Sequence, residues 1–451
     1  MSTNTSSGFQ ADLEGYIADK TLPLARRQLV AFQFADKSEG IPKGRGVTYT
    51  ATRYLRLPLP YAPLSEGVPP IGETMTIQQV TATALQWGDK VTITDVAEMT
   101  IKHPLFQKAI ELVALQLSET LERNTFLALL GGTQINYVNA RTSRANLVAG
   151  DVLDATTVQR TDAALETIGA PRWMGDEMTD TKIDAGKPTR ASADPRSMPH
   201  YVALIHTLVV SDFASDPTVS NAWSWSDLNR LYNYEAGEWR GIRFCKTNMI
   251  PFWTQVANTG QNATAGTAGA LASSTTYNVI ITGSTVDNQY EQLIYAISGN
   301  VNVAGPNGSI SVTLPSTVGY TYSAYIGTTA SPQNLALSAS GPTQGPLAGV
   351  ATQMTGGQTV ILTAIGPMQV PPAAPGAGLT VYPTFVLGRG GYAQVELDNA
   401  RFTYLKDPDK SDPLNQLRIV GWKVFYGTLL SNVQFFGRIE SVSAASSTFD
   451  A

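Results

Sequence analysis

Two neighbouring segments near the N-terminus constrain the fold most, because together they predict an extended hairpin beside an unusually long helix. Apolar and polar residues alternate from 47 to 59, and a period of two indicates a β-strand. Prolines crowd residues 58–70 and mark a turn or tip, since proline cannot donate a ladder hydrogen bond. A second strand returns through residues 74–94, with a bend or bulge predicted at Gly88-Asp89. The hairpin, residues 46–95, carries too few large apolar side chains to close a core of its own.

The helix follows the hairpin directly. Pro104 stands where proline favours the first turn of a helix, apolar residues recur at three- and four-residue spacing up to Leu130, and Gly131-Gly132 ends the run. About 27 residues at ~1.5 Å each give a rod of ~40 Å, longer than most helices in globular proteins. A long rod beside a long hairpin predicts a flat, extended subunit whose hairpin needs a partner surface. The alternative is an ordinary hairpin that packs inside its own domain.

The middle of the chain has a composition of its own. Residues 258–367 are rich in Thr, Ser, Gly, Ala and Asn and carry only two charged side chains, Asp287 and Glu291. Short β-like runs separated by Gly and Pro predict an inserted β-sandwich of immunoglobulin-like size, with a linker at 258–270 before it and a Pro-rich segment at 367–375 after it. The runs are 277–282, 292–297, 309–314, 320–326 and 358–364.

The charge balance favours an assembly over a freely soluble protein. Charged residues make up 15% of the chain, below the roughly 25% of an average soluble protein. The net charge of -5 does not attract nucleic acid or an anionic membrane to the protein as a whole. Residues 20–56 differ, because eight basic residues against two acidic ones give +6. This basic arm either contacts nucleic acid or an acidic neighbouring subunit, or is a solvated charged face. Its assigned residues are Lys20, Arg26, Arg27, Lys37, Lys43 and Arg45.

Cysteine content and apolar runs bear on location. Cys245 is the only cysteine, which excludes an internal disulfide and a multi-cysteine zinc site and fits a reducing cytoplasm. Residues 1–10 are polar, and no run of 18 apolar residues occurs, so we expect neither a signal peptide nor a membrane span.

No motif predicts catalysis, a metal or a cofactor. The histidines His103, His200 and His206 lack the spacing and the companion motifs of a metal site. The glycines of 388–391 lack the strand-then-helix setting of a dinucleotide turn and predict a tight turn instead. We interpret the acidic residues after Trp173 as a loop and the aromatic cluster as core. These are Asp176, Glu177 and Asp180, and Trp223, Trp225, Tyr232, Tyr234 and Trp239.

Three passages follow one another near the N-terminus. They are Ile41-Pro42-Lys43-Gly44-Arg45-Gly46 leading into 47–60, Leu64-Ser65-Glu66-Gly67-Val68-Pro69-Pro70, and Gln86-Trp87-Gly88-Asp89 through 91–95 into the long helix. Three more lie near the C-terminus, at Asp412-Pro413-Leu414, Gly421-Trp422-Lys423 and Arg438-Ile439-Glu440. In this order across ~400 residues, the passages resemble the major capsid proteins of tailed bacteriophages with the Hong Kong 97 fold, in particular the N4-like branch. The order is more specific than each passage alone.

The resemblance implies an α+β fold with defined parts. These are an N-terminal arm at 1–45, an extended loop at 46–95 that overlaps a neighbouring subunit, a spine helix at 96–133, peripheral and axial domains at 134–257 and 368–451, and the insert at 258–367, which we expect on the outer surface. No residue matches the lysine and asparagine crosslink of some relatives. The residues assigned to the inter-subunit hairpin are Val47, Tyr49, Arg53, Leu55, Leu57, Glu66, Gly67, Ile77 and Trp87.

The same resemblance implies a structural protein and not an enzyme. Pentamers and hexamers of the chain would build an icosahedral head shell around double-stranded DNA, made in the bacterial cytoplasm, with no cofactor and no membrane. Portal, scaffold and decoration proteins are candidate partners. The alternatives are an encapsulin-like compartment of the same fold and, from another class, a carbohydrate-binding surface adhesin built around the sandwich.

Overall fold

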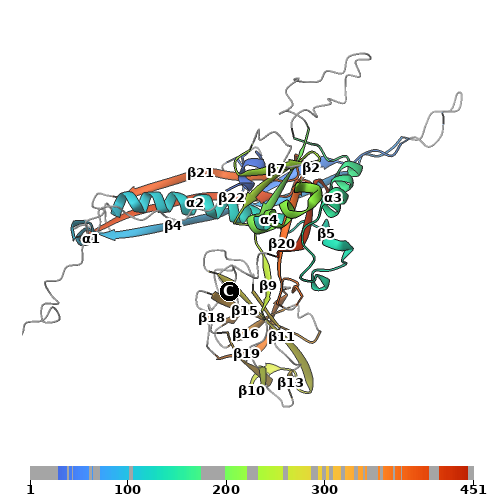
Figure 1. Cartoon of the computed structure of the whole chain (residues 1–451). Helices are drawn as coiled ribbons and strands as arrows, with labels where there is room; N and C mark the ends of the chain where they lie inside the picture. Colours follow the sequence, from blue (N-terminus) through green and yellow to red (C-terminus); the bar gives the residue numbers. More distant parts are fainter. Residues whose placement is uncertain are drawn as a thin grey trace, which may run out of the picture. The chain divides into compact units, whose positions relative to one another are not determined.

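The computed structural model of the chain divides into two units (Figure 1). The first contains residues 1–27, 86–119 and 398–425, and the second contains 28–85, 120–397 and 426–451. The residues that the structure describes are 29–37, 40–42, 44–59, 63, 72–100, 105–173, 199–220, 232–256, 263–285, 293–296, 301–303, 308–315, 320–329, 334–338, 341–342, 354–355, 359–368, 371–376, 378–405 and 416–444.

The first unit combines helix with strand. Its elements are most of β4 (Leu85–Thr94), α1 (Asp95–Thr100), the first part of α2 (Leu105–Leu129), the end of β21 (Ala393–Leu405) and the start of β22 (Leu417–Leu429). In the sheet, β22 lies between β21 and β4. Gln116 links helix to sheet, because its amide donates to Asp89 at 2.6 Å and accepts from the Trp422 indole at 3.0 Å.

The predicted long helix is confirmed as α2, which has 25 residues. Leu, Ala, Glu and Gln dominate it, and the absence of Gly and Pro within it suits a long helix. The predicted stop is also correct, since Gly131 and Gly132 donate to the carbonyls of Ala128 and Leu129. A Cβ at Gly132 would lie 2.4 Å from the Phe436 ring, so a larger residue does not fit. Pro104 lies outside the described residues.

The second unit is built on a mixed sheet with two cores. The strands are β5 (Ile135–Tyr137), β23 (Phe436–Val442), β20 (Thr380–Leu387), β6 (Tyr201–His206), β8 (Ile242–Thr247) and β7 (Glu235–Trp239), paired in that order. Along β6, Tyr201, Ala203 and Ile205 enter one core, and Val202 and Leu204 enter the other. Strands β20 and β23 are buried along their whole length, so they lie at the centre of this sheet.

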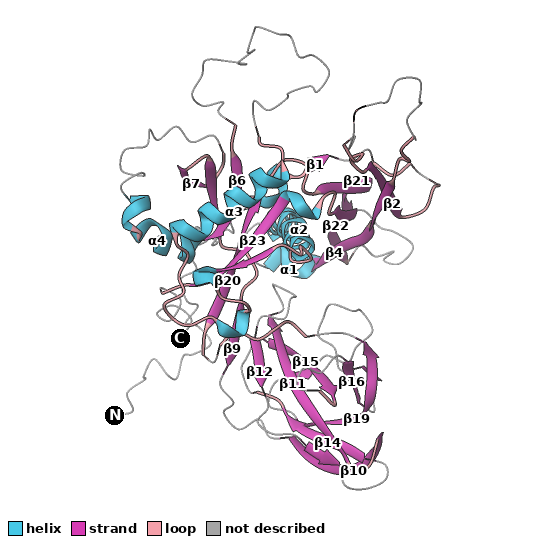
Figure 2. Cartoon of the chain, turned by 90° about the vertical axis from the view of Figure 1, so that its right-hand side faces the viewer, coloured by secondary structure: helices cyan, strands magenta, loops and turns pink. Residues whose placement is uncertain are grey.

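Helices α3 (Ala155–Ile168) and α4 (Thr207–Ser215) supply the first of these cores and lie alongside the sheet (Figure 2). Asp154 begins α3 by accepting the N–H of Thr157 at 3.3 Å, and Gly169 ends it with a φ of 72°. The other core contains Phe126 and Leu129 from α2 and the 3₁₀ turn η2 (Ala31–Phe34). Further 3₁₀ turns are η3 (Val138–Ala140), η4 (Arg144–Asn146) and η7 (Val433–Phe435).

The predicted hairpin is confirmed over part of its length. Strands β2 (Thr48–Tyr54) and β3 (Ile77–Thr83) pair antiparallel, from Thr48 opposite Thr83 to Tyr54 opposite Ile77. The second predicted strand does not stay in the hairpin, because β4 joins the sheet beside β22. No bend interrupts the chain at Gly88-Asp89, since β4 runs through both residues, and the alternative of a bulge there stays a prediction. Glycine is needed there for close approach, as a Cβ at Gly88 would lie 2.6 Å from the carbonyl oxygen of Trp422.

The insert is all β in its described residues, and each of the five predicted runs coincides with a strand. The apolar side chains of its core come from strands in the first and second halves of the insert's sequence. Among them are Ile281, Ile310, Tyr322 and Leu362. The strands are β10 (Ala263–Leu271), β11 (Thr275–Thr285), β12 (Leu293–Ala296), β13 (Val301–Val303), β14 (Gly308–Thr313), β15 (Tyr320–Gly327), β16 (Asn334–Ser338), β17 (Gly341–Pro342), β18 (Met354–Thr355) and β19 (Thr359–Met368).

The prediction of a linker at 258–270 is wrong for its second part, which forms β10. This strand pairs with β14 although all its residues before Leu271 are Ala, Thr or Gly. Small residues suit it because its neighbours come close. A Cβ at Gly266 would lie 2.6 Å from the Ser309 hydroxyl, and one at Gly269 would lie 2.4 Å from the Gly308 carbonyl oxygen. The composition that resembled a flexible linker is thus a packing requirement.

The strand before the insert and the chain after it are neighbours. β9 (Trp253–Val256) pairs with β20 at Thr254 and Thr380 and with β12 inside the insert. Gln255 donates its N–H to the Leu379 carbonyl and accepts from the N–H of Gly378, both at 3.2 Å. The chain segments that lead into the insert and out of it therefore lie side by side.

Candidate functional site

The two faces of the β2–β3 hairpin differ in exposure. Residues directly opposite each other in an antiparallel pair project from the same face. On one face, Tyr49, Ala51 and Val80 pack against a small core that includes Val395 and Leu429. The other face is exposed along its whole length. Its residues are Thr48, Thr50, Thr52, Tyr54, Ile77, Gln79, Thr81 and Thr83.

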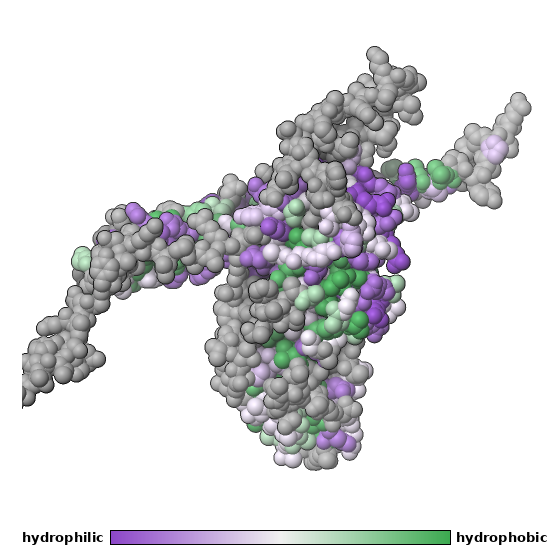
Figure 3. All heavy atoms as spheres, viewed as in Figure 1, coloured by the Kyte–Doolittle hydropathy of each residue, from purple (hydrophilic) through white to green (hydrophobic). Residues whose placement is uncertain are grey.

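Large apolar side chains gather toward the outer end of the described hairpin. Tyr54 is 66% exposed, its cross-strand neighbour Ile77 is 52% exposed, and Leu59 is 89% exposed. Figure 3 shows this as a hydrophobic stretch, in green, on the hairpin. Contiguous exposed apolar surface on a folded chain marks an interaction site or an aggregation hazard. The hairpin is therefore the strongest candidate for a docking surface.

The structure brings most of the predicted hairpin residues together. Val47, Leu55, Leu57 and Ile77 are exposed on it. Tyr49 and Arg53 are half-buried, and the Arg53 guanidinium donates to Gln78 across the pair at 2.8 Å. Trp87 does not belong with them, because it lies on β4 in the first unit. Glu66 and Gly67 lie outside the described residues.

The sequence prediction missed the more exposed side of β2. It selected odd-numbered residues, whereas Tyr54 and the threonines at 48, 50 and 52 form the exposed face. Alternation signals that two faces exist, but which face packs is decided by the residues beneath them, such as Val395 and Leu429.

Only part of the predicted basic arm is described. Lys37 belongs to β1 (Asp36–Lys37), which pairs in parallel with β21 at Gln394. Arg45 is exposed between Gly44 and Gly46, whose φ angles of 85° and 88° favour glycine. Lys20, Arg26, Arg27 and Lys43 lie outside the described residues, so contact of this arm with nucleic acid stays a prediction.

The described histidines are buried and lie in different surroundings. The Nε2 atom of His200 lies 2.9 Å from the Tyr232 hydroxyl. His206 begins α4, accepting the N–H of Leu208 at 3.3 Å, and stacks on Tyr382; burial lowers its pKa to about 4. His103 lies outside the described residues. In the part of the chain that the structure describes, no three His, Cys, Asp or Glu side chains group in a way that could hold a metal ion.

Cys245 is a buried thiol in the second core. Burial raises its pKa, with nearby Glu235 adding to the effect, so the thiolate needed by a nucleophile is disfavoured. Of the predicted aromatic core, Trp239 is buried and Tyr232 packs on Phe34, but Tyr234 is exposed; Trp223 and Trp225 lie outside the described residues. Among the described helices, none is both long and apolar enough to cross a membrane.

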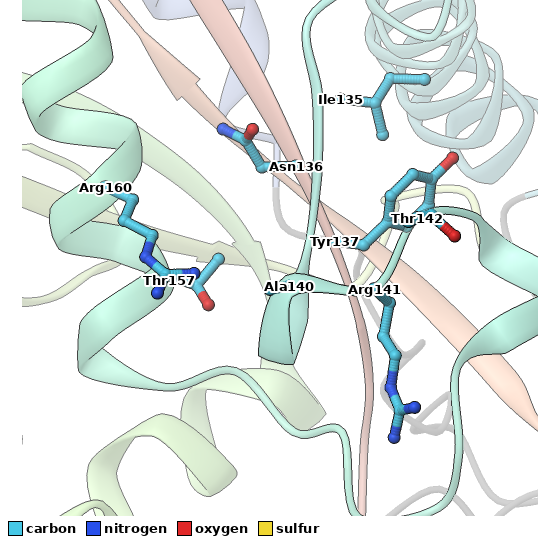
Figure 4. Close-up of a pocket in the computed structure, with 8 residues that line it drawn as sticks. All are labelled: Ile135, Asn136, Tyr137, Ala140, Arg141, Thr142, Thr157 and Arg160. Atoms are coloured by element: carbon cyan, nitrogen blue, oxygen red, sulfur yellow. The ribbon is translucent and has the colours of Figure 1, made fainter.

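A polar pocket of about 270 Å³ lies between α3 and the turn after β5 (Figure 4). Arg141, one of its lining residues, forms an ion pair with Asp151, to which its Nε donates at 2.8 Å. Arg160 is exposed. The lining offers hydroxyl, amide and guanidinium groups and contains no carboxylate, thiol or imidazole. Its residues are Ile135, Asn136, Tyr137, Ala140, Arg141, Thr142, Thr157 and Arg160.

Comparisons with known proteins show the fold of this chain. No family model matches it, and no curated protein matches its sequence. Among solved structures, it is similar to the capsid asymmetric unit of Cyanophage Pam1 at 12% identity, covering 96% of this chain and 98% of that one with a TM-score of 0.51. It is also similar to the capsid of the Cyanophage P-SCSP1u at 10% identity, covering 97% and 96% with a TM-score of 0.50. The chain thus has the mixed α/β fold of phage capsid chains.

Proposed function

We propose that this chain is the major capsid subunit of a tailed bacteriophage and assembles into an icosahedral head shell around double-stranded DNA. The observation that carries the proposal is the fold likeness to two phage capsid chains over nearly the full length of all three. The exposed apolar end of the hairpin supports it, because a shell subunit needs surface that only a neighbour covers.

Within this proposal we assign the fold to the Hong Kong 97 type. The β2–β3 hairpin would be the extended loop, α2 the spine, the first unit the peripheral domain and the six-strand sheet with α3 and α4 the axial domain. Membership of the N4-like branch rests on the sequence passages quoted above. Pentamers and hexamers, packaged DNA, and portal, scaffold and decoration proteins are the proposed partners, and the virion is the proposed location.

We further propose that the insert is an immunoglobulin-like sandwich on the outer surface of the shell. Antiparallel strands around one apolar core support the sandwich. Its lack of Lys and Arg supports the outer position, since a surface without cations lacks the electrostatic attraction that dominates binding to DNA phosphates.

The first prediction is that the full chain, expressed alone or with a phage scaffold protein, forms closed shells visible by electron microscopy. Only monomers or aggregates under all conditions would contradict it. Nucleic-acid content of particles from infected cells distinguishes the two shell functions, because a phage head contains genomic DNA whereas an encapsulin-like compartment contains protein cargo.

A further inference from the structure

A buried carboxylate on α2 holds residues 30–32, which belong to the predicted N-terminal arm at 1–45. Glu122 is 1% exposed. Its Oε1 accepts the N–H groups of Val30 and Ala31 at 2.5 and 2.6 Å, and its Oε2 accepts that of Phe32 at 3.0 Å. Three consecutive N–H groups at the start of a 3₁₀ turn have no acceptors inside the turn. The Glu122 carboxylate, 90 residues further along the chain than Phe32, provides these acceptors.

The carbonyl groups of the same segment are held from the opposite side. The Tyr392 hydroxyl donates to the Ala31 carbonyl at 2.5 Å, and the Gln394 amide donates to the Phe32 carbonyl at 3.0 Å. Tyr392 immediately precedes β21 and Gln394 lies in its first residues, where β1 pairs in parallel. The backbone of residues 30–37 is therefore recognised much as a bound peptide would be.

Apolar packing completes the recognition. Val30, Ala31 and Phe34 are buried against Phe126 and Leu129 of α2. The Phe34 ring meets the edges of Trp173 and Tyr232 at 5.8 and 4.8 Å between ring centroids. These contacts restrict which side chains the segment can carry, because Val30, Ala31 and Phe34 each pack at a separate buried position.

A charge on Glu122 is stabilised only while residues 30–32 are bound. In the described part of the chain, no Lys, Arg or His lies within ion-pair distance of this carboxylate. Burial raises its pKa, and the N–H groups of Val30, Ala31 and Phe32 act against that rise. Without the segment the carboxylate would keep its low-polarity surroundings and lose all three donors, a costly state for a charge.

We propose that Glu122, Tyr392 and Gln394 form a socket that binds residues 30–37, and that assembly into shells requires this segment to be bound in the socket. This inference rests on the proposed function for its last part, since shells form only if the chain is a shell subunit. The socket itself belongs to the single chain and can be tested without assembly.

The test compares hydrogen exchange in the unassembled full chain and in its Glu122→Gln variant. Glutamine keeps the size but loses the charge and turns one acceptor into a donor that faces a peptide N–H. We expect the amides of residues 30–34 to exchange roughly tenfold faster or more, the ratio expected for loss of one charge-assisted hydrogen bond. Amides of β11 and β15 in the insert should keep their rates.

The control is Glu111→Gln on the same helix, because Glu111 is exposed and its pair with Lys108 contributes little. It should leave exchange at 30–34 unchanged. If Glu122→Gln fails to fold, Tyr392→Phe and Gln394→Leu keep the carboxylate and each remove one donor, and both should accelerate exchange at 31–34. Wild-type exchange at 30–34 in every folded variant would overturn the socket.

Assembly gives the second readout. If the chain forms shells, Glu122→Gln should lower their yield at least tenfold at equal protein concentration, whereas Glu111→Gln should not. Unchanged yield with accelerated exchange would show that binding of residues 30–37 in the socket does not matter for assembly and would overturn that part of the proposal. Failure of the wild-type chain to form shells counts against the proposed function and leaves the exchange result standing.

Discussion

At the scale of single residues, buried charges connect parts of the second unit that are distant in sequence. The Arg144 guanidinium donates twice to Glu440, each time at 2.7 Å, lies 3.5 Å from the centroid of the Trp253 ring, and donates to the Ala373 carbonyl. The Nε atom of Arg438 lies 3.1 Å from Oε1 of the same Glu440. Removing one partner of such a buried group typically costs about 3–5 kcal/mol, so this cluster fixes the region where the chain leaves for the insert and returns.

A prediction at this scale concerns the acid stability of the protein. Because burial lowers the pKa of His206 to about 4, the unfolded chain takes up this proton near pH 6.5 but the folded chain does not. The free energy of unfolding is therefore highest above pH 6.5 and falls as pH drops toward 4. The loss from His206 amounts to about 3 kcal/mol. Urea unfolding at pH 7 and pH 4.5 measures it.

The His206→Asn variant isolates the effect. Asparagine also caps helices well, so the N–H of Leu208 keeps an acceptor, but no proton is taken up and the stacking on Tyr382 is lost. We expect lower stability at pH 7 and a smaller loss on acidification than in the wild type. An identical loss in both proteins would assign the acid sensitivity to other groups.

At the scale of elements, the sequence predicts what depends on local pattern. Alternation located β2, and apolar spacing located α2 to within a residue at each end. It failed where distant neighbours decide. The small residues of β10 indicated a linker until β14 was known to lie against them, and β4 left the hairpin to pair beside β22. The Glu122 socket is of the same kind, since nothing near Glu122 in sequence points to Val30.

The hairpin prediction tests the candidate docking surface. Changing both Tyr54 and Ile77 to Thr keeps good strand formers in a paired position and removes two exposed apolar groups. Stability of the unassembled chain should change by less than about 0.5 kcal/mol per site, as is usual on a surface. Burial of such side chains at an interface contributes about 1–3 kcal/mol each, so the concentration needed for assembly should rise at least roughly tenfold.

Ile361→Thr with Ile365→Thr is the matched control, because these β19 residues are 46% and 44% exposed but lie on the insert. Light scattering against protein concentration compares the three proteins. Equal thresholds for the wild type and the hairpin variant would remove the hairpin from the interface.

At the scale of the whole molecule, composition predicted the insert because it changes abruptly along the chain. No Lys or Arg occurs between Lys246 and Arg389, and this span contains the whole insert. The strands inside the insert follow local sequence pattern. How it joins the body could not be predicted. The pairing of β9 with β12 joins residues 39 apart in the sequence, and its pairing with β20 joins residues 126 to 128 apart; such pairings depend on the completed fold.

The last prediction is that the insert can be removed without loss of assembly. Gln255 is hydrogen-bonded to Gly378 and Leu379, so a short Gly-Ser linker in place of residues 258–367 can join the two sides. The deletion keeps Ala373, which accepts from Arg144, and so preserves the buried cluster. Loss of β12 exposes one edge of β9, and a modestly lower melting temperature is expected.

Electron microscopy of the deleted chain beside the wild type decides the outcome. Shells of the same diameter, with less density on their outer surface, are expected if the insert decorates the lattice. Trypsin provides the check on folding, since the wild-type chain has no cleavage site from 247 to 388 and the deleted chain should retain the same resistant body on either side of the linker. A deleted chain that is folded and resistant but forms no shells would make the insert part of the lattice, because the lost contacts would then be those that join one subunit to the next.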